Sequence, residues 1–241
     1  MLLLVPDKAE LRSVACLSAV SLLESLYDVR SLSAIHSIIS FLSNLFAAAK
    51  VMIRSVSIEV GASILHRDWV WSLASKSGSL VGDLFLSIVR RCYDVAPSIR
   101  LRSLAVLSGL LVKAFESHDQ LHSFIIEKLD QPVLEEQTLH EVFRECCFDD
   151  RPLVRAKALA AVEIISLQYS SQPSLDDLDI FAEACEDKSV AVRKQALVSL
   201  IALSQAYPQN SCVMEIFIES ALPRVYDTVC VSFILLRFSV S

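Results

Sequence analysis

Glycine and proline are scarce in this sequence, with 4 and 7 residues among 241. Domains built only from β-strands need turn residues every few positions, and nucleotide-binding folds gather glycines around phosphate groups. The four glycines, Gly61, Gly78, Gly82 and Gly109, form neither pattern. The composition therefore argues against an all-β domain, a Rossmann enzyme and a P-loop enzyme.

Charged residues are also few, at 21%, whereas hydrophobic residues reach 54% and mean hydropathy is +0.50. A chain with this much apolar surface to bury is not expected to be disordered. The formal net charge of −6 is uneven, because residues 1–120 carry 12 basic and 10 acidic side chains and residues 121–241 carry 10 and 18. An acidic second half suits protein partners better than nucleic acid. We expect a helical scaffold rather than an enzyme.

Cysteines and histidines form no recognisable ligand set. The seven cysteines are odd in number, include no CxxC pair and mostly fall in apolar helical patterns, as reduced, buried intracellular cysteines do. His118 and His122 lie four residues apart, but two ligands do not make a zinc site. We therefore expect no metal site, no catalytic residues and no cofactor, and a cytosolic or nuclear location.

One segment, residues 31–49, contains no Asp, Glu, Lys or Arg and is long enough to cross a bilayer. Its large apolar residues recur at steps of three and one, with serines, His36 and Asn44 between them. A helix that faces lipid is apolar all round, whereas this pattern makes a single stripe. The segment therefore predicts an amphipathic helix packed against protein, and no membrane partner.

A repeat is the main feature of the sequence. Segments 94–107, 149–162 and 187–200 align without gaps, and each begins with Asp and has Arg six positions later. Weaker copies contain Arg12 and Arg54, so the copies begin near residues 6, 48, 94, 149 and 187. Their mean spacing of about 45 residues lies in the HEAT and armadillo range. The aligned columns are Asp94, Asp149 and Asp187; Arg100, Arg155 and Arg193; and Leu104, Leu159 and Leu197.

Each column has a physical role on a helix. A β-branched residue, a small residue and a leucine at positions i, i+4 and i+5 form one packing stripe, and the small residue lets a neighbouring helix approach. An aspartate in the turn and an arginine in the helix can hydrogen-bond within or between repeats. The three Asp–Arg pairs therefore predict a structural ladder.

These columns resemble the HEAT family, in which each repeat is a helix pair. The resemblance implies an all-α, right-handed α-solenoid of about five repeats over residues 1–227, followed by an atypical tail at 228–241. We expect helices near 8–26, 31–46, 51–66, 79–93, 97–115, 132–148, 152–169, 175–186, 189–206 and 210–226, with short ones near 68–76 and 119–129. Ser174 and Asp177 predict a capping box before residue 175.

A more specific resemblance lies near the C-terminus. Residues 192–197 read Val-Arg-Lys-Gln-Ala-Leu, and residues 222–225 read Leu-Pro-Arg-Val. Both are similar to the D-type HEAT subunits of condensin, most of all condensin II. The resemblance implies a non-catalytic nuclear subunit in mitotic chromosome condensation, with kleisin and SMC subunits as partners, chromatin or DNA as a further partner, and no small-molecule substrate. The alternative is a scaffold of another class, such as a phosphatase scaffold, a cytoplasmic karyopherin-like transport factor or a cohesin-associated factor.

Basic residues offer candidate contacts. Arg90 and Arg91 precede the turn at Asp94, and Arg102 follows it, so these arginines could contact DNA phosphates. The competing interpretation is a helix C-terminus combined with the Asp–Arg ladder. Lys157 and Lys194 lie outside the ladder columns and are candidate partner contacts on the face where solenoids usually bind.

Overall fold

The computed structural model describes residues 9–29, 31–74, 79–117 and 119–226. Within these residues every secondary-structure element is a helix and none is a strand, which confirms the all-α prediction. The chain divides into two compact units, residues 1–136 (unit 1) and 137–241 (unit 2). The tail at 228–241 and His118 lie outside the described residues.

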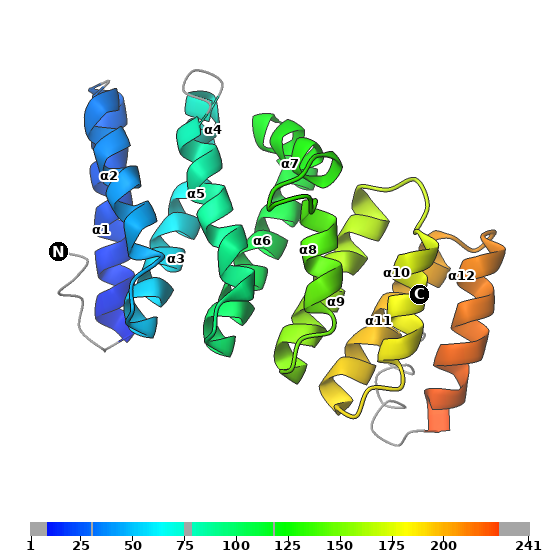
Figure 1. The fold of residues 1–241 in the computed structure, drawn as a ribbon. Helices are drawn as coiled ribbons and strands as arrows, with labels where there is room; N and C mark the ends of the chain where they lie inside the picture. The colour runs from blue at the N-terminus through cyan, green and yellow to red at the C-terminus, as the bar shows by residue number, and fades with distance from the viewer. Residues whose placement is uncertain (1–8, 30, 75–78, 118, 227–241) are drawn as a thin grey trace. The chain divides into compact units, whose positions relative to one another are not determined.

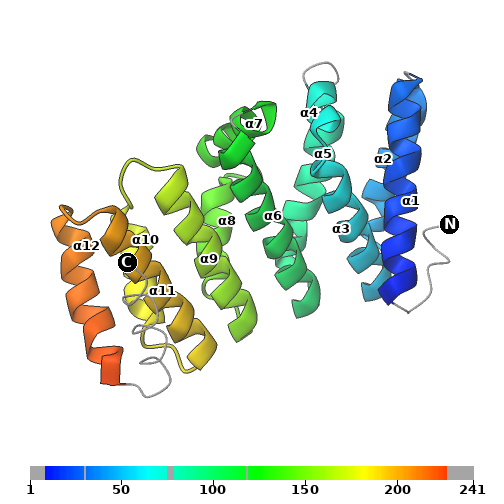
Figure 2. The same ribbon diagram turned by 180° about the vertical axis from the view of Figure 1, so that it is seen from behind.

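Unit 1 arranges its helices in two layers (Figure 1 and Figure 2). Helices α1, α3 and α6 pack side by side in one layer, and α2 packs on α5 in the other, while α7 packs on α4 and α6. The elements are α1 (Ala9–Asp28), α2 (Leu32–Leu45), α3 (Val51–Leu65), α4 (Asp68–Ala74), α5 (Ser79–Val89), a 3-10 turn (Arg90–Tyr93), α6 (Pro97–Ser117) and α7 (Gln120–Asp130).

The core of unit 1 depends on one close approach at Gly61. This residue lies in a packing column of α3, where a Cβ atom would come within 3.1 Å of Phe46 Cζ and 3.4 Å of Ile88 Cδ1. Carbon atoms are rarely that close, so a larger residue would push α5 or the end of α2 away. The single stripe predicted for α2 is also present, since Ile35 and Ile39 are buried.

Unit 2 repeats the two-layer arrangement. Helix α9 packs along α11, and α10 packs on α12 in the other layer, where α8 also lies (Figure 2). The elements are α8 (Leu139–Cys146), α9 (Pro152–Gln168), α10 (Leu175–Ala184), α11 (Val190–Ala206), α12 (Ser211–Ile216), one π turn (Phe217–Ala221) and one 3-10 turn (Leu222–Tyr226). Pro152 occupies the first turn of α9, where its missing N–H costs nothing.

Three predicted helices differ from the structure. The helix expected at 79–93 is α-helical only as far as Val89, and Arg90–Tyr93 form a 3-10 turn. The helix expected at 132–148 begins only at Leu139, because Thr138 and Glu141 form a capping box that fixes its start. The helix expected at 210–226 is α-helical only as far as Ile216 and continues as a π turn followed by a 3-10 turn. No helix among the described residues is both long enough and apolar enough to span a bilayer.

The leucine column of the repeat is buried in both units. Leu104 of α6 and Leu159 of α9 are 0% exposed, and Leu197 of α11 is 3% exposed. In unit 1, Leu104 lies on α6, in the layer that also contains α1 and α3. In unit 2, Leu159 and Leu197 lie on α9 and α11, which pack against each other. They therefore contribute to the contacts that hold neighbouring helix pairs together.

Candidate functional site

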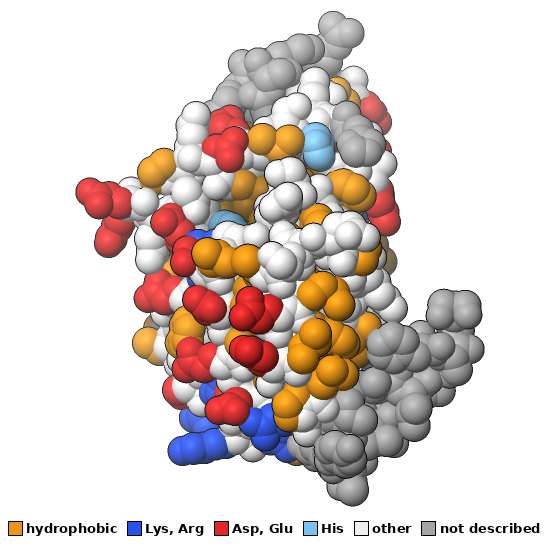
Figure 3. Space-filling model, turned by 90° about the vertical axis from the view of Figure 1, so that its right-hand side faces the viewer, with side chains coloured by type: hydrophobic (Ala, Val, Ile, Leu, Met, Phe, Trp, Pro, Cys, Tyr) orange, Lys and Arg blue, Asp and Glu red, His pale blue; other side chains and the backbone are white. Residues whose placement is uncertain are grey.

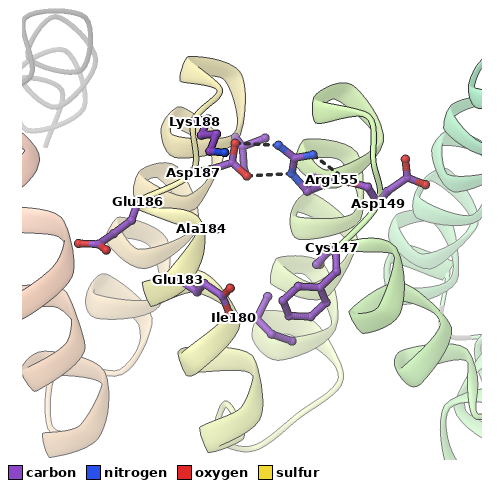
Figure 4. Close-up of a pocket in the computed structure, with 11 residues that line it drawn as sticks. Cys147, Asp149, Arg155, Ile180, Glu183, Ala184, Glu186, Asp187 and Lys188 are labelled. Atoms are coloured by element: carbon purple, nitrogen blue, oxygen red, sulfur yellow. Dashed lines mark hydrogen bonds and ion pairs between the residues drawn. The ribbon is translucent and has the colours of Figure 1, made fainter.

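Arg155 connects two successive helix pairs of unit 2 (Figure 4). Its Nε and Nη2 atoms each donate to a carboxylate oxygen of Asp187 at 2.8 Å, and its Nη1 donates to the carbonyl of Asp149 at 2.7 Å. A bidentate pair of this kind fixes both distance and orientation. Because Asp187 lies in the turn before α11, the arginine of α9 holds the following helix pair in register.

Unit 1 contains the same arrangement, made by Arg54 and Asp94. Arg54 Nε lies 2.8 Å from Asp94 Oδ2, and its Nη2 donates to Oδ1 at 2.8 Å. Its Nη1 donates to the carbonyls of Ala48 and Ala49 at 2.7 and 2.9 Å. Arg91 adds an ion pair to the same carboxylate at 3.1 Å. We call these two arrangements the Arg–Asp links.

The backbone contact of the link recurs in four copies of the repeat. Nη1 donates to the carbonyl of the residue six positions earlier, at 2.7 Å from Arg54 and Arg155 and at 2.9 Å from Arg100 and Arg193. The aspartates also share a turn contact, because one carboxylate oxygen accepts the N–H two residues later. These pairs are Asp94–Ala96 at 2.9 Å, Asp149–Arg151 at 2.8 Å and Asp187–Ser189 at 2.7 Å.

The links change the acidity of their aspartates. Burial alone would raise the pKa of Asp94 and of Asp187, but hydrogen bonds from Arg54 or Arg155 and from the turn N–H outweigh it. The pKa of each carboxyl is therefore below its ordinary value of 3.8. On the other side of the link, the hydrogen bonds to Asp187 raise the pKa of Arg155.

This acidity makes the stability of unit 2 depend on pH. A carboxyl whose folded pKa lies below its unfolded pKa adds stability at pH values above the unfolded pKa, and that stability is lost as pH falls through the folded value. We expect Asp187→Asn to lower the free energy of unfolding by about 1–3 kcal/mol at pH 7 and by much less near pH 3. Urea unfolding at both pH values measures this difference. Glu215→Gln, at an exposed carboxylate of α12, is the control, and an equal effect of both variants at pH 7 would contradict the role of the link.

A second buried network surrounds Asp177, which is 1% exposed. Its carboxylate lies 3.0 Å from His140 Nε2, accepts from Arg144 Nε at 2.8 Å and accepts from the Ser166 hydroxyl at 3.1 Å. Burial would raise the pKa of Asp177, but the hydrogen bonds from His140 and Arg144 lower it. The network ties α8, α9 and α10 together inside unit 2.

The Asp177 network corrects one expectation from the sequence. The Ser174 hydroxyl accepts the N–H of Asp177 at 3.2 Å, as in a capping box. The carboxylate of Asp177, however, turns to Arg144 and His140. The second half of the capping box is therefore not made by Asp177, and Arg144 Nη2 donates to the Ser174 hydroxyl at 2.7 Å.

Two of the candidate basic contacts in unit 1 have acidic partners. Arg91 pairs with Asp94, and Arg102 pairs with Glu59 of α3. Arg90 is exposed at the end of α5. In unit 2, Lys157 of α9 and Lys194 of α11 are half-buried, and burial lowers the pKa of Lys157. The basic strip expected around the turn at Asp94 is therefore partly neutralised.

The described residues contain no cluster of three or more His, Cys, Asp or Glu side chains that could hold a metal ion. Five cysteines, Cys16, Cys92, Cys146, Cys147 and Cys185, are buried, and burial holds the pKa of the Cys147 thiol well above its ordinary value. Such a thiol is a poor nucleophile.

No protein-family model matches the chain, and a search of curated proteins finds no match.

Proposed function

We propose that the chain is a segment of a HEAT-type right-handed α-solenoid of about five repeats and acts as a non-catalytic binding scaffold. The observation that carries this proposal is the arginine contact to the carbonyl six residues earlier, which recurs from Arg54 to Arg193. This contact fixes each turn to its own helix, and the Arg–Asp links join successive helix pairs within each unit. The buried leucines of the same frame support the proposal.

Within this class, we propose a D-type subunit of condensin II as the parent protein. The similarity of residues 192–197 and 222–225 to that family supports the assignment. The chain would then act in mitotic chromosome condensation in the nucleus and bind kleisin and SMC subunits. Lys157 and Lys194, on neighbouring helices α9 and α11, are the proposed partner contacts in unit 2.

Co-purification tests the condensin assignment. The intact gene product, tagged and isolated from dividing cells, should bring down SMC and kleisin subunits in amounts comparable to its own. Lys194→Glu should weaken their recovery, whereas Lys50→Glu, at an exposed residue before α3, should leave it unchanged. Recovery of phosphatase subunits or transport cargo instead would replace the condensin assignment with another scaffold class.

Direct DNA contact is a separate part of the proposal, through Arg90, Arg91 and Arg102. Because Arg91 and Arg102 already pair with carboxylates, we expect weak duplex binding that falls steeply with salt as counterions are released. Titration of labelled duplex at two salt concentrations, with Arg90→Ser as the variant, measures it. Absence of binding at low salt would remove DNA from the proposed partners and leave only proteins.

A further inference from the structure

A groove of about 480 Å³ opens in unit 2 between the end of α8, the following turn and α10 (Figure 4). Its apolar lining comes from Cys147, Phe148, Ile180, Ala184 and Val192. Ile180 of α10 faces the end of α8 across this space, and the Arg155–Asp187 link closes one end. The groove is therefore built on elements that the link holds in place.

Phe148 gives the groove an exposed aromatic wall. The side chain is 58% exposed, although it belongs to a turn whose neighbours Cys146 and Cys147 are buried. Large apolar side chains beside a groove are typical of contacts with partner proteins, where aromatic and aliphatic anchors supply most of the binding energy.

The charges beside the groove determine which charge its occupant should carry. Arg155 and Asp187 neutralise each other, which leaves Asp149, Glu183 and Glu186 against Lys188 among the charged lining residues. Glu186 also meets Arg224 Nη2 at 2.6 Å, so Glu183 is the exposed carboxylate at the groove without such a basic neighbour in the described part of the chain.

Helix α10 extends this negative charge away from the groove. Its exposed carboxylates, Asp176, Asp179 and Glu183, are spaced by three and four residues, which places them along one side of the helix, although Asp176 pairs with Arg144 at 3.3 Å. Acidic side chains also gather on the face where α12 lies, and most basic ones on that face are confined to its lower edge (Figure 3). An approaching segment with positive charge is favoured over its acidic counterpart.

We propose that this groove binds a basic segment of a partner protein, with one apolar side chain inserted beside Phe148 and a lysine or arginine paired with Glu183. The proposal rests on the binding-scaffold role above but not on the condensin assignment. The carboxylates of α10 steer the segment toward the groove, and the apolar contact fixes its position.

A binding titration with the full chain tests the proposal. The probe is a fluorescent short peptide with several lysines around one leucine, and fluorescence anisotropy gives its Kd. We expect Glu183→Gln to weaken binding about tenfold, as loss of a charge-assisted hydrogen bond does. Phe148→Ala should weaken it by a similar factor, and a peptide with serine in place of the leucine should reproduce that loss on the unaltered chain.

Matched variants separate the groove from general acidity. Glu215→Gln removes the same charge from α12 outside the groove, and Leu175→Ala removes an exposed apolar side chain elsewhere on α10, so both should change Kd less than about twofold. Equal effects of Glu183→Gln and Glu215→Gln would overturn the proposal. Self-association of the chain that Phe148→Ala abolishes, without peptide binding, would also overturn it and assign the groove to a second copy. Neither result would alter co-purification with SMC and kleisin subunits, so the two proposals fail independently.

Discussion

Replacing Arg54 with methionine is expected to destabilise unit 1 by about 3–5 kcal/mol, the cost of leaving a buried charge without its partner. The side chains of Arg54 and Asp94 are 7% and 2% exposed, so water cannot replace the lost guanidinium. The Arg91 pair remains, but its side chain is 25% exposed and contributes one contact. The turn between α5 and α6 should lose order first.

Denaturant unfolding followed by circular dichroism measures the change in stability, and amide hydrogen exchange localises it to α3 and α6. Arg67→Met is the control, because Arg67 pairs with Glu24 at side-chain exposures of 45% and 37% and should cost less than about 1 kcal/mol. Adding Asp94→Asn to Arg54→Met should restore part of the loss, since it removes the stranded charge. A cost for Arg54→Met no larger than that of Arg67→Met would refute the link as a stabilising contact.

Truncating a leucine of the repeat column should have an effect of similar size. Leu159→Ala is expected to lower the free energy of unfolding by about 2–5 kcal/mol, because it removes buried methyl groups and leaves a cavity between α9 and its neighbours. Leu104→Ala and Leu197→Ala should behave alike in their own helices. Leu153 offers a matched control in the same helix α9, since it is 62% exposed whereas Leu159 is 0% exposed.

The melting midpoint and the urea midpoint report this difference. Leu153→Ala should change stability by no more than about 0.5 kcal/mol. If both leucine variants lowered the midpoints equally, the packing frame read from the repeat would be wrong, even though the helices themselves were correct.

The sequence predicted the long helices well and their partners less well. The expected ranges 97–115, 152–169 and 189–206 lie within two residues of α6, α9 and α11, because proline, aspartate and the apolar stripe act locally. The late start of α8 was missed because the helix was expected from residue 132, although Thr138 and Glu141 carry a clear start signal.

Contacts between distant residues were harder to predict. The ladder was expected to join aspartate and arginine of one repeat or of neighbours, and spacing alone left that choice open. The structure joins Arg54 to Asp94 and Arg155 to Asp187, 40 and 32 residues apart. The Asp177 network was missed entirely, because its donors come from two other helices, α8 and α9, and only the local Ser174 signal is visible in one stretch of sequence.

The turn aspartates impose an asymmetry on how the protein can drift by mutation. One carboxylate both accepts the N–H two residues later and receives the guanidinium of the preceding copy, as Asp187 does from Ser189 and Arg155. If the arginine is lost, the aspartate is still needed for its own turn. If the aspartate is lost, the turn and the arginine's partner vanish together, and glutamate cannot restore both because its extra methylene moves the carboxylate out of the turn. Substitution of the arginine therefore leaves the following turn with its own hydrogen bond, whereas substitution of the aspartate disturbs that turn and the contact between helix pairs together.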